Sequence, residues 1–307
     1  SGSQTFGLTS NLTLLADSEI YFNGGNILNY SGAEVSVGKV LTLGGNGQLQ
    51  NTSDLNLGAG GKLKLSEISV AKVITSADSL GLDVADNSTV SSLSVAHITP
   101  VSIAAGKTLS GGITVTGGSI KLGETGTLAS TVSMSGGTLD ADNNLTLSGA
   151  LSHSENITID VANYRTLTYS GTAINVGANT ITLSGGGSLV SGGITLNDAQ
   201  SKLLLNKITL DSASTSANSL GLDVDDNSAI TSLSVGHITP VSIKANKSLS
   251  GSITVTGGSI KLGETGTLAS AVSMSGGTLD ADNNLTLSGG LTQSGNITID
   301  VAENKTL

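Results

Sequence analysis

One stretch of the chain returns almost unchanged further along the sequence. Residues 113–149 read ITVTGGSIKLGETGTLASTVSMSGGTLDADNNLTLSG, and residues 253–289 differ from them only by Ala271 in place of Thr131. At the same offset of 140 residues, residues 68–167 align with residues 208–307 without a gap. A fixed period is typical of repeat architectures, in which one structural unit is stacked many times. The chain is therefore predicted to fold as a series of similar units.

The repeat divides the chain into three parts. Residues 28–167 and 168–307 form two superrepeats, and residues 1–27 resemble the degenerate end of a preceding repeat or a partial cap. We expect the two superrepeats to form one continuous solenoid. Because the chain begins Ser1-Gly2-Ser3 without a methionine, it is expected to be a fragment of a longer protein.

Short runs inside each superrepeat alternate between apolar and polar residues. The runs span three to five residues, as at 35–37, 63–65, 120–122 and 181–183. This period of two is that of a β-strand with one buried face. Gly-Gly, Asp-Asn and Ser-Gly pairs, which favour tight turns, separate the runs. The chain is predicted to be all-β.

A shorter repeat distinguishes a solenoid from a sandwich. The pattern of residues 113–120 is echoed by residues 132–139, a spacing that matches one coil of a solenoid. A sandwich would use longer strands and larger core residues. Here aromatic residues are only 2% of the chain and tryptophan is absent, so the apolar content is aliphatic. We predict an elongated parallel β-helix (β-solenoid) of short strands, with roughly 20 residues per coil.

Charge and hydropathy exclude two classes of partner. The formal net charge is −10, and the 13 Lys and Arg residues are scattered singly. Nucleic-acid binding is not expected, because it depends on clustered basic residues. No apolar run is long enough to insert this segment into a membrane. The absence of cysteine fits a secreted bacterial surface protein but is compatible with the cytosol too.

Several glycine-rich motifs resemble those of one known group of proteins. Residues 41–49 read LTLGGNGQL, residues 181–189 read ITLSGGGSL and residues 285–291 read LTLSGGL. They are similar to passenger repeats of filamentous-haemagglutinin-like and autotransporter adhesins. The resemblance covers nearly the whole chain. It implies a right-handed parallel β-helix at the surface of a Gram-negative bacterium, serving as a stalk or an adhesive shaft.

Two equivalent corners carry the candidate metal ligands. Their side-chain oxygens fall at the first, third and fifth positions of a calcium loop. The sixth position is Leu145 where the loop needs glycine, and the twelfth is Leu151 where it needs an acid. An Asx-rich turn is the alternative. We expect no metal or other cofactor, and the calcium candidates are Asp140, Asp142, Asn144, Asp280, Asp282 and Asn284.

Histidine, tyrosine and proline give no further site. His97 and His237 each precede Thr-Pro and have no ligand partner nearby in sequence, so they are interpreted as turn residues. Tyr164 and Tyr169 are interpreted as a junction between superrepeats or as a contact for a sugar or partner. The two prolines, lacking an N–H, are expected at corners where the strand ladder is interrupted.

The residues favour a structural or adhesive role over catalysis. β-Helix enzymes need clustered acids in one groove, whereas the acids here are dispersed and the superrepeats nearly duplicate each other. We therefore expect a non-catalytic rod segment of a large extracellular repeat protein, which spaces an adhesive tip and contacts a receptor, glycan or neighbouring cell. The alternative is a carbohydrate-active or carbohydrate-binding β-helix. Open strand edges at the solenoid ends are also expected to cause self-association.

Overall fold

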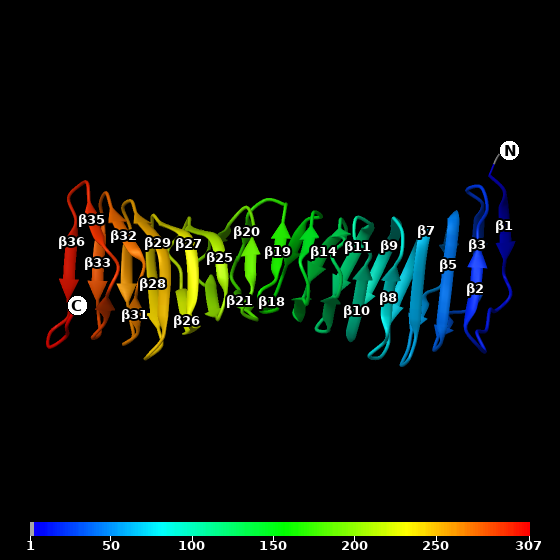
Figure 1. Ribbon diagram of the computed structural model, residues 1–307, viewed down its shortest axis with the longest axis horizontal. Helices are drawn as coiled ribbons and strands as arrows, with labels where there is room; N and C mark the ends of the chain where they lie inside the picture. Colours follow the sequence, from blue (N-terminus) through cyan, green and yellow to red (C-terminus); the bar gives the residue numbers. More distant parts are fainter. Residues whose placement is uncertain (1–2) are drawn as a thin grey trace. The chain divides into compact units, whose positions relative to one another are not determined.

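The computed structural model describes residues 3–307, which form 36 β-strands and no helix (Figure 1). The strands pair in parallel, and each pairs with a strand one coil away along the chain. This arrangement is a β-solenoid, and the all-β fold with coils of about 20 residues is confirmed. The chain forms two compact units, the first ending at Ser154 and the second running from Glu155 to Leu307.

The strands of the first unit are β1 (Thr5–Leu8), β2 (Ser18–Tyr21), β3 (Ile27–Tyr30), β4 (Val35–Val37), β5 (Val40–Asn51), β6 (Leu55–Leu57), β7 (Lys62–Thr75), β8 (Gly81–Val84), β9 (Ser88–Val95), β10 (Ile98–Ile103), β11 (Thr108–Val115), β12 (Ser119–Leu122), β13 (Thr127–Leu128), β14 (Thr131–Met134), β15 (Thr138–Ala141), β16 (Leu145–Leu147) and β17 (Leu151–His153). The strands of the second unit are β18 (Ile157–Val161), β19 (Thr166–Tyr169), β20 (Ile174–Asn175), β21 (Thr180–Ser184), β22 (Ser188–Val190), β23 (Ile194–Leu196), β24 (Lys202–Asn206), β25 (Thr209–Thr215), β26 (Gly221–Asp226), β27 (Ser228–Val235), β28 (Ile238–Ile243), β29 (Ser248–Val255), β30 (Ser259–Leu262), β31 (Thr267–Leu268), β32 (Ala271–Met274), β33 (Thr278–Ala281), β34 (Thr286–Leu287), β35 (Leu291–Gln293) and β36 (Thr298–Val301).

The short echo in the sequence is one coil of the solenoid. Ile113 in β11 pairs in register with Val132 in β14, and Ile120 in β12 pairs with Leu139 in β15. Both pairs join equivalent positions of the echo. The same sequence pattern is thus stacked on itself, which allows similar side chains to pack in consecutive coils.

Aliphatic ladders fill the interior of each unit. In the first unit one ladder passes through Leu41, Leu63, Leu82, Val101 and Leu122, all at most 1% exposed. In the second unit the corresponding ladder consists of Ile181, Leu203, Leu222, Val241 and Leu262, all fully buried. Each coil buries its apolar side chains against the coils before and after it, so stability depends on contacts between neighbouring coils.

Several strands are longer than the alternation predicts, and β5 and β7 are the longest of those that the structure describes. β5 has 12 residues and β7 has 14, whereas the alternating runs are only three to five residues long. Both contain a corner at a non-glycine residue with positive φ, Asn46 at 61° and Glu67 at 54°. The register of the β5–β7 pair shifts between Gly44 and Gly47. Pairing is therefore interrupted at the corner, where residues 45 and 46 lie opposite Glu67 as a bulge, and it resumes between Gly47 and Ile68.

The prolines lie within strands, and their expected placement at corners is wrong. Pro100 is the third residue of β10 and pairs in register with Lys121 of β12. The ladder is nevertheless interrupted on the other side, since pairing of β10 with β8 begins only at Val101. Gly81, at φ 77°, lies directly against the Pro100 carbonyl. The missing N–H is thus accommodated by an irregular glycine in the neighbouring coil.

Candidate binding groove

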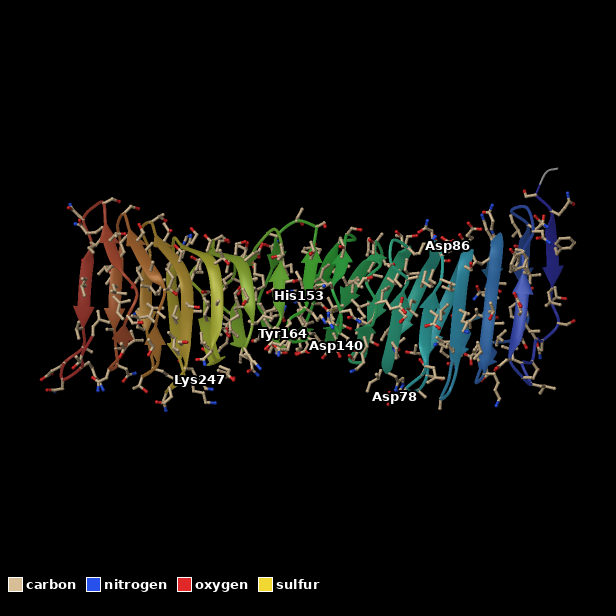
Figure 2. All side chains as sticks on the ribbon, viewed as in Figure 1. Asp78, Asp86, Asp140, His153, Tyr164 and Lys247 are labelled. Carbon is tan, nitrogen blue, oxygen red and sulfur yellow. The ribbon has the colours of Figure 1, made fainter. Side chains whose placement is uncertain are left out.

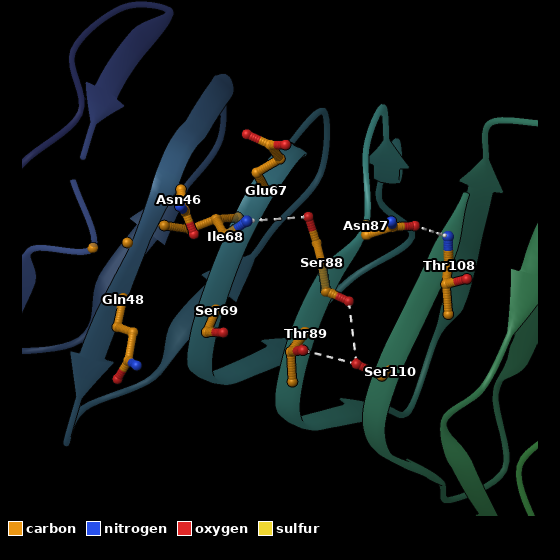
Figure 3. A pocket seen from close by; sticks show the side chains of 12 residues that line it. Asn46, Gln48, Glu67, Ile68, Ser69, Asn87, Ser88, Thr89, Thr108 and Ser110 are labelled. Atoms are coloured by element: carbon orange, nitrogen blue, oxygen red, sulfur yellow. Dashed lines mark hydrogen bonds between the residues drawn. The ribbon is translucent and has the colours of Figure 1, made fainter. Parts of the chain in front are cut away.

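A polar groove of about 500 Å³ lies on the first unit, where β5, β7, β9 and β11 leave their corners (Figure 3). We call it groove 1. Its lining consists of Gly25, Asn46, Gly47, Gln48, Glu67, Ile68, Ser69, Asn87, Ser88, Thr89, Thr108 and Ser110. Most of these residues come from the four strands and from the corners that precede them, so each coil contributes a similar short segment.

The floor of groove 1 is set by a buried serine at an inward position. Ser88 is 5% exposed and faces the interior. It is in register with Leu109 of the next coil, and it lies opposite Ile68 of the preceding coil. Its hydroxyl donates to the Asp86 carbonyl at 2.9 Å and accepts from the Ile68 N–H at 3.4 Å. Ser88 lines the groove, and its hydrogen bonds satisfy backbone groups that the corner would otherwise leave unpaired.

Four neutral side chains form a ladder along groove 1. Gln48 pairs in register with Ser69, Ser69 with Thr89, and Thr89 with Ser110. Parallel strands bring equivalent residues of adjacent coils about 4.8 Å apart. The hydroxyl oxygens of Thr89 and Ser110 are 2.7 Å apart and share a hydrogen bond. The ladder thus presents neutral donors and acceptors at a regular spacing, and Glu67 is exposed at its rim.

The second unit carries an equivalent groove in the second superrepeat, which we call groove 2. It has a volume of about 220 Å³ and is lined by Gly186, Lys207, Ile208, Thr209, Asn227, Ser228, Ala229, Ser248 and Ser250. The buried serine is kept, because Ser228 donates to the Asp226 carbonyl at 2.8 Å and accepts from the Ile208 N–H at 3.3 Å. Ala229 replaces Thr89, and Lys207 replaces Glu67. Groove 2 is therefore smaller, lacks one hydroxyl and has a cationic rim.

An ion pair lies beside each groove. The Lys107 ammonium is 2.7 Å from a carboxylate oxygen of Asp86, and Lys247 is 2.7 Å from Asp226. Hydrogen bonding to Lys107, and then to the Asn87 N–H, holds the pKa of Asp86 below its ordinary value. Hydrogen bonding to Lys247 and to Asn227 lowers the pKa of Asp226 in the same way. Both pairs join adjacent coils.

Replacing Lys107 by Met is expected to raise the pKa of Asp86 towards its ordinary value, because the largest stabilising contact of the carboxylate is lost. A carboxyl with a lowered folded-state pKa contributes stability above its unfolded pKa of about 3.9, and this contribution is lost as the pH falls through the folded pKa. The variant should therefore lose less stability than the parent below about pH 4. NMR titration of the Asp86 carboxyl carbon measures the shift. Lys247→Met is the matched control and should leave Asp86 unchanged; an unaltered Asp86 pKa in Lys107→Met would contradict the pairing.

The calcium candidates were expected at corners, but Asp140, labelled in Figure 2, is the third residue of β15, and Asp280 is the third residue of β33. The other candidates lie at the corners that follow these two strands. Asp140 forms an ion pair with Lys121 at 3.0 Å, and Asp280 forms one with Lys261 at 3.4 Å. Asp142, Asn144, Asp282 and Asn284 are exposed on the same corners. Across residues 3–307, no group of three or more His, Cys, Asp or Glu side chains is placed to hold a metal ion. The expectation that these residues bind no metal stays a prediction.

Of the two tyrosines near the junction between the superrepeats, one is buried and the other is exposed. Tyr169 is 4% exposed, whereas Tyr164, at φ 62°, is 90% exposed. The ring of Tyr169 lies over Gly171, just as the ring of Tyr30 lies over Gly32. Tyr-Ser-Gly is therefore a structural corner in both superrepeats, and the two tyrosines of the junction do not form one contact surface.

Sequence reasoning did not identify the grooves, and it interpreted His97 and His237 as turn residues without a ligand. His97 and His237 are exposed at equivalent turns, and His153 is half-buried in β17. Within the described residues, no helix has the length and apolarity needed to cross a membrane. The sequence matches no protein-family model and no curated protein, and the chain matches no solved structure.

Proposed function

We propose that the chain is a non-catalytic structural and adhesive segment of a large bacterial cell-surface or secreted repeat protein. The observation that supports this role is the repetition itself. Equivalent ladders, corners and grooves recur in the second superrepeat, so much of the sequence serves to duplicate one surface. Such a segment spaces an adhesive tip from the cell and presents the same contacts several times.

The architecture suits a load-bearing role because neighbouring coils are joined by continuous backbone ladders. Additional superrepeats lengthen a solenoid without altering the contacts inside each coil. The similarity of its glycine-rich motifs to filamentous-haemagglutinin-like and autotransporter adhesins supports an extracellular location. The partners we propose are a surface receptor, a glycan or a neighbouring cell.

Self-association through an exposed strand edge is a second mode of contact. β36 pairs with β33 on one side, and its Ile299 and Val301 are 49% and 40% exposed. The equivalent residues Ile159 and Val161 are at most 1% exposed, and their strand β18 pairs with β21. A further coil, from this chain or from a second copy, would bury Ile299 and Val301 in the same way.

Surface display tests the adhesive role. The segment is fused to an outer-membrane carrier in a non-adherent bacterium, and the attachment of these cells to epithelial cells and to one another is measured. Cells that display the segment should adhere and aggregate several-fold more than cells that display the carrier alone. Equal adherence would contradict the proposed role. Release of reducing ends from a polysaccharide panel by the purified protein would instead support the carbohydrate-active alternative.

A further inference from the structure

Three properties define which ligands groove 1 can accept. Its volume of about 500 Å³ accommodates a ligand of several sugar-sized units. Its ladder of Gln48, Ser69, Thr89 and Ser110 crosses four coils, so a ligand must be extended to use all of it. Its lining residues carry hydroxyls and amides, with no aromatic ring and one carboxylate, that of Glu67.

These properties exclude several ligand classes. A phosphate or other strong anion needs cationic side chains or converging N–H donors, and the only charged lining residue of groove 1 is the acidic Glu67. An apolar ligand needs an apolar lining, and Ile68 is buried beneath the floor. A metal ion needs several oxygen ligands with negative charge, and Glu67 supplies a single carboxylate. The remaining class consists of ligands whose neutral groups both donate and accept hydrogen bonds.

We propose that groove 1 binds a neutral, extended oligosaccharide whose sugar units lie along the Gln48–Ser69–Thr89–Ser110 ladder. Serine and threonine hydroxyls each offer one donor and two acceptor lone pairs, and the glutamine amide offers both kinds of group. A sugar hydroxyl has the same dual capacity, so each coil can exchange hydrogen bonds with one part of the chain. Because the ladder has a period of about 4.8 Å, a repeating polymer fits it better than a single sugar.

Groove 2 provides an internal comparison for this proposal. Ala229 interrupts its ladder where groove 1 has Thr89, and its volume is less than half as large. Lys207 at its rim replaces the acid. Groove 2 is therefore expected to bind a neutral oligosaccharide more weakly than groove 1. This proposal rests on the adhesive role proposed above, because a glycan is one of the partners named there, and it assigns that partner to one groove.

The probes are maltohexaose, cellohexaose and chitohexaose, each compared with its monosaccharide and with hexagalacturonate as an acidic analogue. Binding to the complete chain is followed by calorimetry and by NMR shifts of the Gln48 and Asn87 side-chain amides. At least one neutral hexasaccharide should bind with millimolar or better affinity, about tenfold more tightly than its monosaccharide. Hexagalacturonate should bind more weakly, because Glu67 repels it.

Three variants locate the site. Ser110→Tyr fills groove 1 and should abolish oligosaccharide binding. Ser250→Tyr places the same side chain in groove 2 and should leave most of the binding intact. Thr89→Ala should weaken binding several-fold, and it is expected to fold because Ala229 occupies the equivalent place in the second unit. Circular dichroism and melting curves confirm the fold of each variant.

Three outcomes would overturn the proposal. They are the absence of binding by every neutral hexasaccharide, unchanged binding in Ser110→Tyr, and tighter binding of hexagalacturonate than of the neutral probes. None of these results bears on adherence by displayed cells, so failure of the groove is distinguishable from failure of the adhesive role.

Discussion

Gly81→Ala is expected to destabilise the protein by about 4 kcal/mol or more, a cost reserved for severe disruptions of the native structure. The added Cβ would lie 1.8 Å from the carbonyl oxygen of Pro100 in the next coil. That atom belongs to the backbone of β10 and cannot move without displacing the buried ladder around Val101. The φ of Gly81 is 77°, which alone costs a residue with a Cβ about 1–2 kcal/mol. Urea unfolding followed by circular dichroism measures the loss.

Gly106→Ala separates the backbone strain at Gly81 from the steric contact. Gly106 has a similar φ of 72°, but a Cβ there would meet nothing within 4 Å. Its equivalent in the second unit is Asn246, at φ 63°, so the corner accepts a side chain. The control should cost only about 1 kcal/mol. If both variants lost the same stability, the left-handed backbone would explain the requirement for glycine, and the contact with Pro100 would not.

The strand pattern and the length of a coil could be predicted from the sequence because both depend on local alternation. An apolar residue at every second position specifies which face is buried, and a slip by one residue would expose the whole set. For the same reason the echo between residues 113–120 and 132–139 indicates the pairing of Ile113 with Val132 that the fold contains.

The long strands could not be predicted, because the local sequence does not show that a strand continues through a corner. Glu67 has no intrinsic preference for positive φ, yet it takes this conformation at a corner where β7 continues. Pro100 likewise lies inside a strand because Gly81, in the preceding coil, adapts to it. In both places contacts between coils override the local preference.

Groove 1 was missed for a related reason. Ser69, Thr89 and Ser110 resemble every other outward-facing hydroxyl in the sequence, and only stacking brings them into one ladder. One signal was nevertheless present in the sequence. Ser88 and Ser228 occupy equivalent positions of the two superrepeats, where the alternation favours an inward aliphatic residue. Both serines line their grooves, but the signal is not specific, because Thr99 and Ser130 are also buried polar residues and line neither groove.

The second large effect is expected from one substitution made at two equivalent places in the second unit. Ile159→Ala should destabilise the protein by about 2–5 kcal/mol, because Ile159 is 1% exposed and its removal leaves a cavity between neighbouring coils. Ile299→Ala should change stability by no more than about 0.5 kcal/mol, because Ile299 is 49% exposed. The two residues occupy identical Ile-Thr-Ile-Asp-Val sequences, so neither local propensity nor chemistry differs between them. Denaturant unfolding of dilute protein measures both values.

Association between copies would change the effect of Ile299→Ala. If β36 of one copy pairs with another copy, Ile299 becomes buried, and Ile299→Ala should then weaken self-association. Sedimentation velocity over about a hundredfold range of concentration should show concentration-dependent oligomers for the parent chain and fewer for Ile299→Ala. A parent chain that stays monomeric throughout would contradict pairing at β36. Equal costs of the two substitutions in dilute, monomeric protein would mean that burial between coils does not determine the stability of the stack, which is the physical basis of the whole fold.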